Sequence, residues 1–590
     1  MLDAGAVREA QCARRGSMED DVSIGMRKGL TAYGDPEFSL FLRKAFIRAM
    51  GYSDEALERP IVGIADTGSD YNPCHGTAPQ IVEAVKRGVL GAGGLPMVFP
   101  TVSLHESFAY PTSMYLRNLM AMDTEEMLRA QPMDAVVAIG GCDKTIPAQL
   151  MAIASVDLPA IVVPVGPMLT TTHDGERLGA CTDCRRLWAQ YRAGTIDAAA
   201  IGAVTGRLAP TAGTCMVMGT ASTMAAVTET LGLTLPGGAA IPAVHGERYR
   251  QAEISGMRAV TLAREGTRAS RFLTRASFRN AFRVLHCLGG STNAVIHLTA
   301  VARRCGIEVD LDEFDALGEA TPVLVNLKPA GEHYMEHLHE AGGIPVLLRE
   351  IADLLDTSTP NVSGQTLAEI VAGAVEAKGQ TAIRRRANPV YAKGGLRVLR
   401  GNLAPGGALI KESAATPSLL RHEGRAVVFE SVEDVVNRID DPALDIRADD
   451  VIVMRNAGPK GHPGMPEAGY VPIPRKLARE GVKDMVRVSD ARMSGTAFGT
   501  IVLHVTPEAR VGGPLALAET GDRIVLDVPA RRIDLLVDEA TLAARRARLA
   551  PYAVPEEARG YERLLLETIE QADRGCDFGF MAPSKVTRGF

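Results

Sequence analysis

A cysteine, an aspartate and a lysine stand side by side at residues 142–144, directly after two glycines. The preceding D-A-V-V-A-I is a β-branched run typical of a strand, and the following Q-L-M-A-I-A-S has a helical composition. Cys142, Asp143 and Lys144 are therefore expected at a turn from a strand into a helix. In α/β proteins ligands bind at such turns, and the helix N-terminus favours a thiolate or a carboxylate. The alternative is a glycine turn with a buried cysteine and a surface ion pair.

Two further cysteines share this context. Cys74 ends the segment I-V-G-I-A-D-T-G-S-D-Y-N-P-C before a helical stretch, and Cys215 lies in T-A-G-T-C-M-V-M-G before a helix of small residues. A helix N-terminus lowers the pKa of a thiol, and thiolates bind iron or zinc. Each cysteine alone is more often a buried, inert thiol. The three matching contexts favour a shared metal site without proving that the thiols meet.

Cys181 and Cys184 form the only C-x-x-C of the chain. One such pair fits half a zinc site, a redox dithiol or chance, and no second pair completes a zinc site. We interpret it as a coincidence in a surface loop. The other cysteines are interpreted as ordinary thiols: Cys12, Cys287, Cys305 and Cys576.

Three carboxylates could hold a cation. Glu106 stands in T-V-S-L-H-E-S, Asp143 follows Cys142, and Glu467 stands in G-H-P-G-M-P-E-A-G. Oxygen ligands in such loops suit Mg²⁺, although each carboxylate alone is more often a helix cap or a surface charge. Lys144 would repel a cation unless its amine is neutral and modified to present oxygens.

Ser494 precedes Gly495 in R-V-S-D-A-R-M-S-G-T-A-F-G-T, where a tight turn is predicted. A serine in a turn usually forms a local hydrogen bond. No Ser-His-Asp spacing surrounds Ser494, so the sequence does not favour a hydrolase triad.

Length and composition restrict the class of protein. A chain of 590 residues predicts two or three domains, and 46% hydrophobic with 23% charged residues is typical of globular proteins. A formal net charge of -6 without a sustained Lys/Arg run argues against a nucleic-acid partner. No segment has the apolar length of a signal peptide or a membrane span, and nine scattered cysteines fit a reducing compartment. We expect a cytoplasmic protein that acts on a small molecule.

The hydrophobic pattern predicts an α/β fold. Strand-like runs at 60–65, 134–139 and 158–165 alternate with helical stretches, which indicates a mostly parallel sheet covered by helices. Two helices rich in buried residues are expected at 216–232 and 292–304. After about residue 385 short strands and glycine turns indicate a β-rich, barrel-like domain. The predicted units are an N-terminal extension (1–30), an α/β domain (31–385) and the barrel-like domain (386–590).

Six segments together resemble the family of dihydroxy-acid and sugar-acid dehydratases, also called the IlvD/EDD family. They follow one another in family order from about residue 60 to beyond residue 500. The segments are N-P-C (72–74), G-G-C-D-K-T (140–145), C-M-V-M-G-T-A-S-T-M (215–224), G-G-S-T-N-A-V-I-H-L (289–298), G-M-P-E (464–467) and A-R-M-S-G-T-A (491–497).

The resemblance implies a [2Fe-2S] cluster held by Cys74, Cys142 and Cys215, in which one iron stays open as a Lewis acid. It also implies Mg²⁺ held by Glu106, Asp143 and Glu467, with a carbamylated Lys144 as a further ligand. The implied fold is an α/β domain followed by a barrel-like domain. Homodimers, or dimers of dimers, with active sites near the subunit interface are implied as well.

The resemblance also implies the reaction. A substrate carboxylate and C2 hydroxyl would bind Mg²⁺, Ser494 as a metal-stabilised alkoxide would remove the C2 proton, and the open iron would take the C3 hydroxyl. The product would be a 2-keto-3-deoxy acid. Thr496 directly after Gly495 resembles the branch that dehydrates sugar acids such as arabinonate, xylonate, gluconate or galactonate.

Some positions depart from that branch. Relatives often carry Trp where this chain has Gly68, Asn where it has His75, and G-T-D plus an aromatic residue where it has C-T-D-C. The alternatives are therefore a dihydroxy-acid dehydratase of branched-chain amino-acid synthesis and a phosphogluconate dehydratase. A non-enzymatic thiol sensor or metal-binding scaffold is the alternative from another class.

Overall fold

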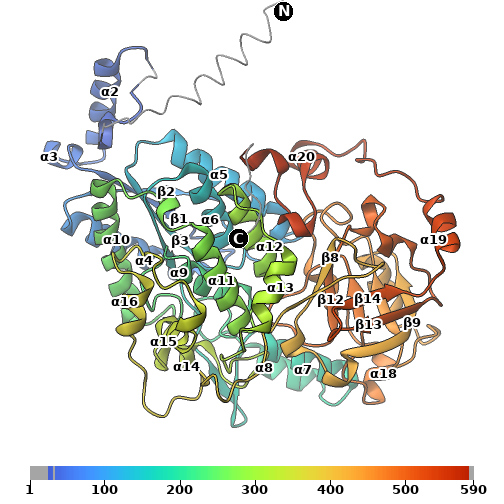
Figure 1. Cartoon of the computed structure of the whole chain (residues 1–590). Coiled ribbons are helices and arrows are strands. Elements are labelled where there is room, and N and C mark those ends of the chain that lie inside the picture. Colours follow the sequence, from blue (N-terminus) through green and yellow to red (C-terminus); the bar gives the residue numbers. More distant parts are fainter. Residues whose placement is uncertain (1–23, 31–32, 584–590) are drawn as a thin grey trace, which may run out of the picture.

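The first sheet consists of four parallel strands in the order β2-β1-β3-β4 (Figure 1). The computed structural model describes residues 24–30 and 33–583. Almost every residue of three of these strands is buried, because helices cover both faces of the sheet. The strands are β1 (Ile61–Asp66), β2 (Leu95–Pro100), β3 (Ala135–Gly140) and β4 (Ala160–Pro164).

Two groups of helices pack on this sheet. Helices α4 (Ala78–Gly91) and α10 (Gly246–Glu265) form one group, and their axes approach closely because glycines face the partner backbone. A Cβ at Gly88 would lie 1.9 Å from the Glu253 carbonyl oxygen. The second group packs around α6 and comprises α5 (Arg117–Ala130), α6 (Thr145–Val156), α9 (Thr220–Thr230), α11 (Arg275–Cys287) and α12 (Thr292–Arg304).

The second sheet has eight strands in the order β14-β13-β9-β10-β11-β12-β8-β7. An isolated bridge between Arg400 and Arg532 joins its two edges, so the sheet is a nearly closed barrel. Apolar side chains fill its interior. The strands are β7 (Arg397–Leu399), β8 (Gly407–Ile410), β9 (Arg421–Phe429), β10 (Val451–Met454), β11 (Arg487–Ser489), β12 (Ile501–Thr506), β13 (Arg523–Asp527) and β14 (Arg532–Leu535).

The C-terminal segment returns from the barrel to the first domain through α20 (Gly560–Thr568). Arg304 of α12 binds Asp577 at 2.8 Å and Glu125 of α5 at 3.1 Å, and all three side chains are buried. Arg117 donates to the carbonyl oxygens of Gly575 and Cys576. These buried polar contacts join the segment that follows the barrel to the helices of the first domain.

The predicted α/β fold class with its barrel-like second part is confirmed. The helix expected at 292–304 is α12, whereas the helix expected at 216–232 is shorter because residues 216–219 form an irregular turn before α9. The domain boundaries stay a prediction, and most of the predicted extension, with Cys12, lies outside the described residues. Among the helices that the structure describes, none combines the length and apolar content that crossing a membrane requires.

Candidate active site

A cavity of about 1200 Å³ opens at the carboxyl ends of the parallel strands. Cys74 follows β1 in the short 3-10 helix Pro73–His75, and Glu106 follows β2. Cys142 and Asp143 lie between β3 and α6, as the sequence predicts. Three strands that are adjacent in the sheet therefore bring these side chains to one wall, although 68 residues separate the two cysteines.

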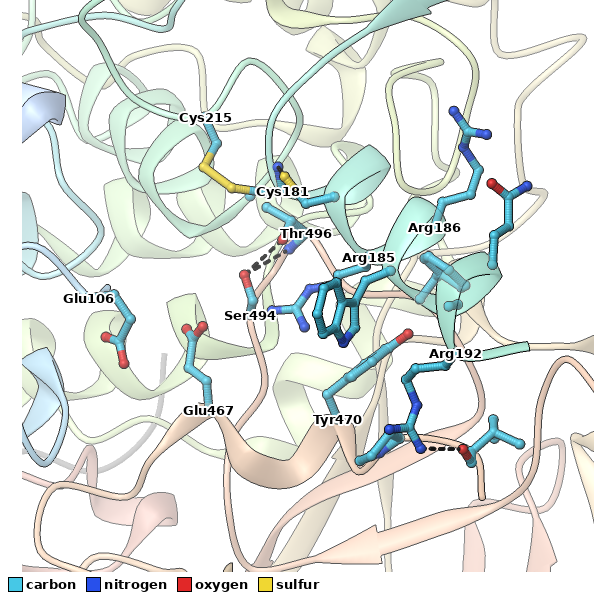
Figure 2. A pocket seen from close by; sticks show the side chains of 18 of the residues that line it. Glu106, Cys181, Arg185, Arg186, Arg192, Cys215, Glu467, Tyr470, Ser494 and Thr496 are labelled. Atoms are coloured by element: carbon cyan, nitrogen blue, oxygen red, sulfur yellow. Dashed lines mark hydrogen bonds between the residues drawn. A yellow bond between two sulfur atoms is a disulfide. The ribbon is translucent and has the colours of Figure 1, made fainter. Parts of the chain in front are cut away.

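The barrel supplies the opposite wall. Glu467 begins the 3-10 helix Glu467–Tyr470, and Ser494 and Thr496 lie in the turn between β11 and β12. Figure 2 shows Glu106, Glu467, Ser494, Thr496 and Cys215 around the same space. The cavity thus lies between the two parts of the chain and contains side chains from both.

Two of the three predicted ligand thiols are already adjacent. The sulfur atoms of Cys74 and Cys142 and a ring nitrogen of His105 lie within 4.8 Å of one another, and both cysteines are buried. The hydrogen bond from Cys142 lowers the pKa of Cys74 to about 6, whereas sharing that bond raises the pKa of Cys142. Sequence reasoning missed His105, although it directly precedes Glu106.

The third predicted thiol, Cys215, is paired with Cys181 in a disulfide. The interpretation of the C-x-x-C as a surface-loop coincidence is therefore wrong, because Cys181 and Cys184 both line the cavity. Cys181 is the N-cap of α7 (Thr182–Ala193), and its backbone NH donates to the Cys184 sulfur at 3.2 Å. With a φ of 76°, Cys181 adopts a backbone conformation that favours glycine. Its partner lies 34 residues away, a distance at which the sequence gives no sign of pairing.

The three predicted carboxylates converge. Oxygen atoms of Glu106, Asp143 and Glu467 lie within 4.8 Å of one another. Lys144, which is fully buried, donates to Asp143 at 2.5 Å and to Glu106 at 3.2 Å. The sequence predicted this set, and the structure brings all its members together.

Arg492 completes the charge balance of the carboxylate cluster, and sequence reasoning missed it. Its guanidinium donates to Glu467 at 2.6 Å and to Glu106 at 3.2 Å, and no part of it is exposed. Burial opposes ionisation of Glu106, but Lys144 and Arg492 together hold its pKa well below the usual value. Burial likewise disfavours the Lys144 cation, yet the surrounding carboxylates raise its pKa. The available signal was the position of Arg492 in the A-R-M-S-G-T-A segment.

The serine turn is held by contacts of its own. Ser494 Oγ and Thr496 Oγ1 lie 2.8 Å apart, and the Thr496 amide donates to Ser494 Oγ at 3.4 Å. The fully buried amine of Lys411, also missed from the sequence, donates to the Gly495 carbonyl at 3.1 Å. A Cβ at Gly495 would lie 2.6 Å from Ser291, so only glycine fits there.

His75 supports the turn that carries Cys142. Its Nε2 accepts hydrogen bonds from the backbone NH groups of Gly141 at 3.0 Å and Cys142 at 2.9 Å. Its Nδ1 donates a hydrogen bond to the Thr67 carbonyl at 2.8 Å. Burial lowers the pKa of His75 to about 4, so the ring is neutral, as an acceptor at Nε2 must be. His75, which stands where relatives often carry Asn, therefore supports the turn that carries the predicted ligand Cys142.

Two family models match the chain. The N-terminal model of dihydroxy-acid/6-phosphogluconate dehydratases matches residues 59–370, and the corresponding C-terminal model matches residues 381–576. The matched segments contain every residue of the site described above.

Curated relatives match over nearly the whole chain. An L-arabonate dehydratase of Azospirillum brasilense is 46% identical over 94% of this chain and 96% of its own length. A 6-deoxy-6-sulfo-D-gluconate dehydratase of Pseudomonas putida is 44% identical over 90% of this chain and 91% of its own. A dihydroxy-acid dehydratase of Syntrophobacter fumaroxidans is 38% identical over 91% and 95%.

The buried imidazole of His75 generates a prediction about acid stability. Its folded pKa of about 4 lies below the ordinary value of 6.5, so the unfolded chain binds the extra proton first as pH falls. The stability linked to His75 is complete above pH 6.5 and is lost between pH 6.5 and 4, by about 3 kcal/mol in total. Between pH 7.5 and 5 the free energy of unfolding should therefore fall by about 2 kcal/mol more in the parent chain than in His75→Gln.

The matched control is His173→Gln in the surface hairpin strand β5 (Thr171–His173). It should retain the acid sensitivity of the parent chain. If His75→Gln retains the full acid sensitivity of the parent chain, the His75 ring does not titrate in this range and its proposed neutral state is wrong.

Proposed function

Because the chain belongs to the dihydroxy-acid/6-phosphogluconate dehydratase family and is therefore a hydro-lyase, we propose that it dehydrates a 2,3-dihydroxy sugar acid. The product would be the 2-keto-3-deoxy acid and water. The observation that carries the proposal is the convergence of two thiols, three carboxylates and a serine at one cavity between the two parts of the chain.

Two comparisons favour a sugar acid over a branched-chain dihydroxy acid. The relatives named for arabonate and sulfogluconate are 46% and 44% identical, whereas the relative named for dihydroxy acids is 38% identical. The turn R-M-S-G-T with Thr496 points to the same branch. A panel of gluconate, xylonate, arabinonate, galactonate, glycerate and dihydroxyisovalerate, read out as 2-keto acid, tests the choice. Turnover of dihydroxyisovalerate alone would favour the branched-chain alternative.

The residues present fit the cofactors that the family implies. Cys74 and Cys142 are adjacent, and the hydrogen bond between them lowers the pKa of Cys74, which suits a metal–thiolate site. Cys215 lines the same cavity. Cys215 can become a ligand only after a dithiol reductant transfers two electrons and two protons to the Cys181–Cys215 disulfide. We propose a [2Fe-2S] cluster on these three thiols and Mg²⁺ on Glu106, Asp143 and Glu467.

When bound, the cation and the cluster supply Lewis acidity toward the substrate carboxylate, its C2 hydroxyl and the departing C3 hydroxyl. Ser494 Oγ takes the C2 proton. The electron pair of the C2–H bond forms the C2–C3 double bond while the C3–O bond breaks, and the enol then tautomerises to the keto acid. The Thr496 amide and hydroxyl, both beside Ser494 Oγ, stabilise the negative charge that this base requires.

We further propose that Lys144 is carbamylated in the active enzyme. Its amine is enclosed by the carboxylates that would hold Mg²⁺, and a carbamate would replace a repelling cation with an oxygen ligand. Activity should therefore fall when bicarbonate is rigorously removed and return on its addition, and Lys144→Met should not be rescued. Unmodified lysine in a density map of the active enzyme would contradict the proposal.

A homodimer or a dimer of dimers in the cytoplasm completes the proposal. Helix α2 (Pro36–Arg48) stands away from the rest of the molecule in Figure 1, and Phe38, Phe41 and Phe46 are exposed on it. Exposed aromatic residues of this kind are typical of a surface that a partner covers. Sedimentation equilibrium distinguishes a dimer from a monomer.

One observation favours the alternative of a thiol sensor. The structure pairs Cys181 with Cys215, and such a disulfide would be reduced and re-formed as redox conditions change, whether or not the chain is a catalyst. A sensor without iron would be colourless and would not dehydrate any sugar acid, so an absorption spectrum of the anaerobically purified protein separates the two functions.

The ligand assignment predicts the effect of single cysteine substitutions. Cys74→Ser, Cys142→Ser and Cys215→Ser should each lose the visible absorption and most of the bound iron, because each removes a proposed ligand. Cys181→Ser and Cys184→Ser should retain both. The parent should bind more iron when it is reduced before reconstitution, whereas Cys181→Ser should not depend on that step. Cys305→Ser, at a partly buried thiol outside the cavity, is the control. Full iron content in all three ligand variants would refute the assignment.

The assignment of Ser494 as the base predicts that a variant without its hydroxyl keeps the cluster but loses most of its turnover. Ser494→Ala should retain colour and fold while kcat falls by about 10²- to 10⁴-fold, the usual contribution of a general base. Thr496→Ala should be milder, because the amide next to Ser494 remains. Exchange of the substrate C2 proton with solvent deuterium measures the step directly. Exchange as fast without the Ser494 hydroxyl as with it would assign the base to another group.

A further inference from the structure

The walls of the cavity differ in charge along its length. The three acidic residues that line it within the described part of the chain, Glu106, Asp143 and Glu467, all lie at the inner end beside the thiols. The outer wall is formed by α7 and by residues 470–487. Among the residues of this wall that line the cavity in the described part of the chain, the charged side chains are all cations: Arg185, Arg186, Arg192, Lys483 and Arg487. A ligand that fills the cavity therefore passes from carboxylates to a basic outer wall.

Most of these cations are neutralised or solvated. Arg192 pairs with Asp440 at 2.7 Å, Arg186 with Glu176 at 2.7 Å, and Arg487 with Asp484. Lys483 is exposed to solvent. Of the guanidinium groups on this wall, Arg185 is the one for which no carboxylate of the described residues lies within 4.0 Å.

Arg185 is held in place without being neutralised. Its guanidinium carbon lies 4.7 Å from the ring centre of Tyr470, a cation–π contact that fixes the group and leaves its charge intact. Its Nε is buried without a hydrogen-bond partner among the described residues. Because a buried donor without a partner is unfavourable, an anion that contacts this guanidinium from the cavity would be stabilised there. In Figure 2 Arg185 and Ser494 face the same space.

We propose that Arg185 binds a second anionic group at the end of the substrate remote from its C1 carboxylate. The inference rests on the proposed function, which places the C1 carboxylate at the inner end of the cavity. The remaining carbons of a sugar acid then extend toward the outer wall. The substrate class is a sugar acid that carries an additional oxyanion on its terminal carbon.

The charge of the outer wall indicates which kind of oxyanion the substrate carries on its terminal carbon. One free guanidinium balances one negative charge, and its planar fork matches two oxygens of a carboxylate or a sulfonate. A phosphate carries close to two charges at neutral pH and would leave one without a buried partner on this wall. A terminal carboxylate or sulfonate is therefore favoured over a terminal phosphate.

The test compares substrates of equal carbon number. Gluconate, glucarate, 6-deoxy-6-sulfogluconate and 6-phosphogluconate differ in the group on C6 and in its charge. The parent enzyme should show a kcat/KM at least 10-fold higher for the carboxylate or the sulfonate than for gluconate, and the phosphate should rank below them. The kcat/KM values for glucarate and 6-deoxy-6-sulfogluconate show whether the chain prefers a terminal carboxylate or a terminal sulfonate.

Substitution assigns the preference to the residue. Arg185→Gln should lower kcat/KM for the preferred dianion by 10- to 100-fold, mainly through KM, and change that for gluconate by less than 3-fold. Arg185→Lys should recover part of the loss, because it restores the charge but not the planar fork. Arg186→Gln is the matched control, since Arg186 lines the same wall but already binds Glu176 and Asp183.

Each outcome of these experiments either supports or overturns the oxyanion site at Arg185. Equal or better use of gluconate by the parent, or an equal loss for both substrates in Arg185→Gln, overturns the inference while leaving the dehydratase function intact. If no sugar acid is dehydrated, the proposed function fails, and calorimetric binding of glucarate and gluconate to the parent and to Arg185→Gln still tests the oxyanion site. Tighter glucarate binding that depends on Arg185 supports it, and equal affinities overturn it.

Discussion

The structure of the site depends on one buried ionic contact, the bond of Arg492 to carboxylates from both parts of the chain. Its guanidinium reaches Glu467 of the barrel and Glu106 of the α/β part, and it is fully enclosed. Removing one member of a buried ion pair costs about 3–5 kcal/mol, because the partner is left charged in a poorly polar environment. An arrangement of the two parts that left these charges unpaired would lose this stabilisation, and the arrangement that pairs them forms the cavity.

The same charge balance links structure to chemistry. Three carboxylates within 4.8 Å repel one another, and Lys144 and Arg492 offset most of that repulsion. A divalent cation could take over the role of the Lys144 ammonium, which is why the proposed carbamate of Lys144, with its neutral nitrogen and anionic oxygens, is compatible with metal binding. The carboxylates are thus held close together by protein cations, and replacement of one cation by another need not disturb the fold.

The sequence predicted the parts of the site that depend on local structure. Strand-to-helix turns place Cys74, Cys142 and Asp143 at one edge of a parallel sheet, and hydrophobic periodicity reveals such turns. Reasoning from the sequence missed His105, Arg492 and the pairing of Cys181 with Cys215. These contacts join segments that are separate in the chain, and no local pattern records them. Helix 216–232 was predicted too long because small apolar residues suit both a helix and the irregular turn that precedes α9.

The disulfide and the basic outer wall have a common origin in α7. Its N-cap, Cys181, reaches Cys215 at the inner end of the cavity, while Arg185 one turn later faces the outer part. The positive φ of Cys181 directs the chain into α7, so the helix that carries Arg185 starts from a strained residue bonded to a proposed ligand. Reduction of the disulfide would free Cys215 and at the same time release the N-cap of this helix from its covalent anchor. In the proposed function, cofactor loading and the position of the outer wall would therefore both depend on this backbone segment.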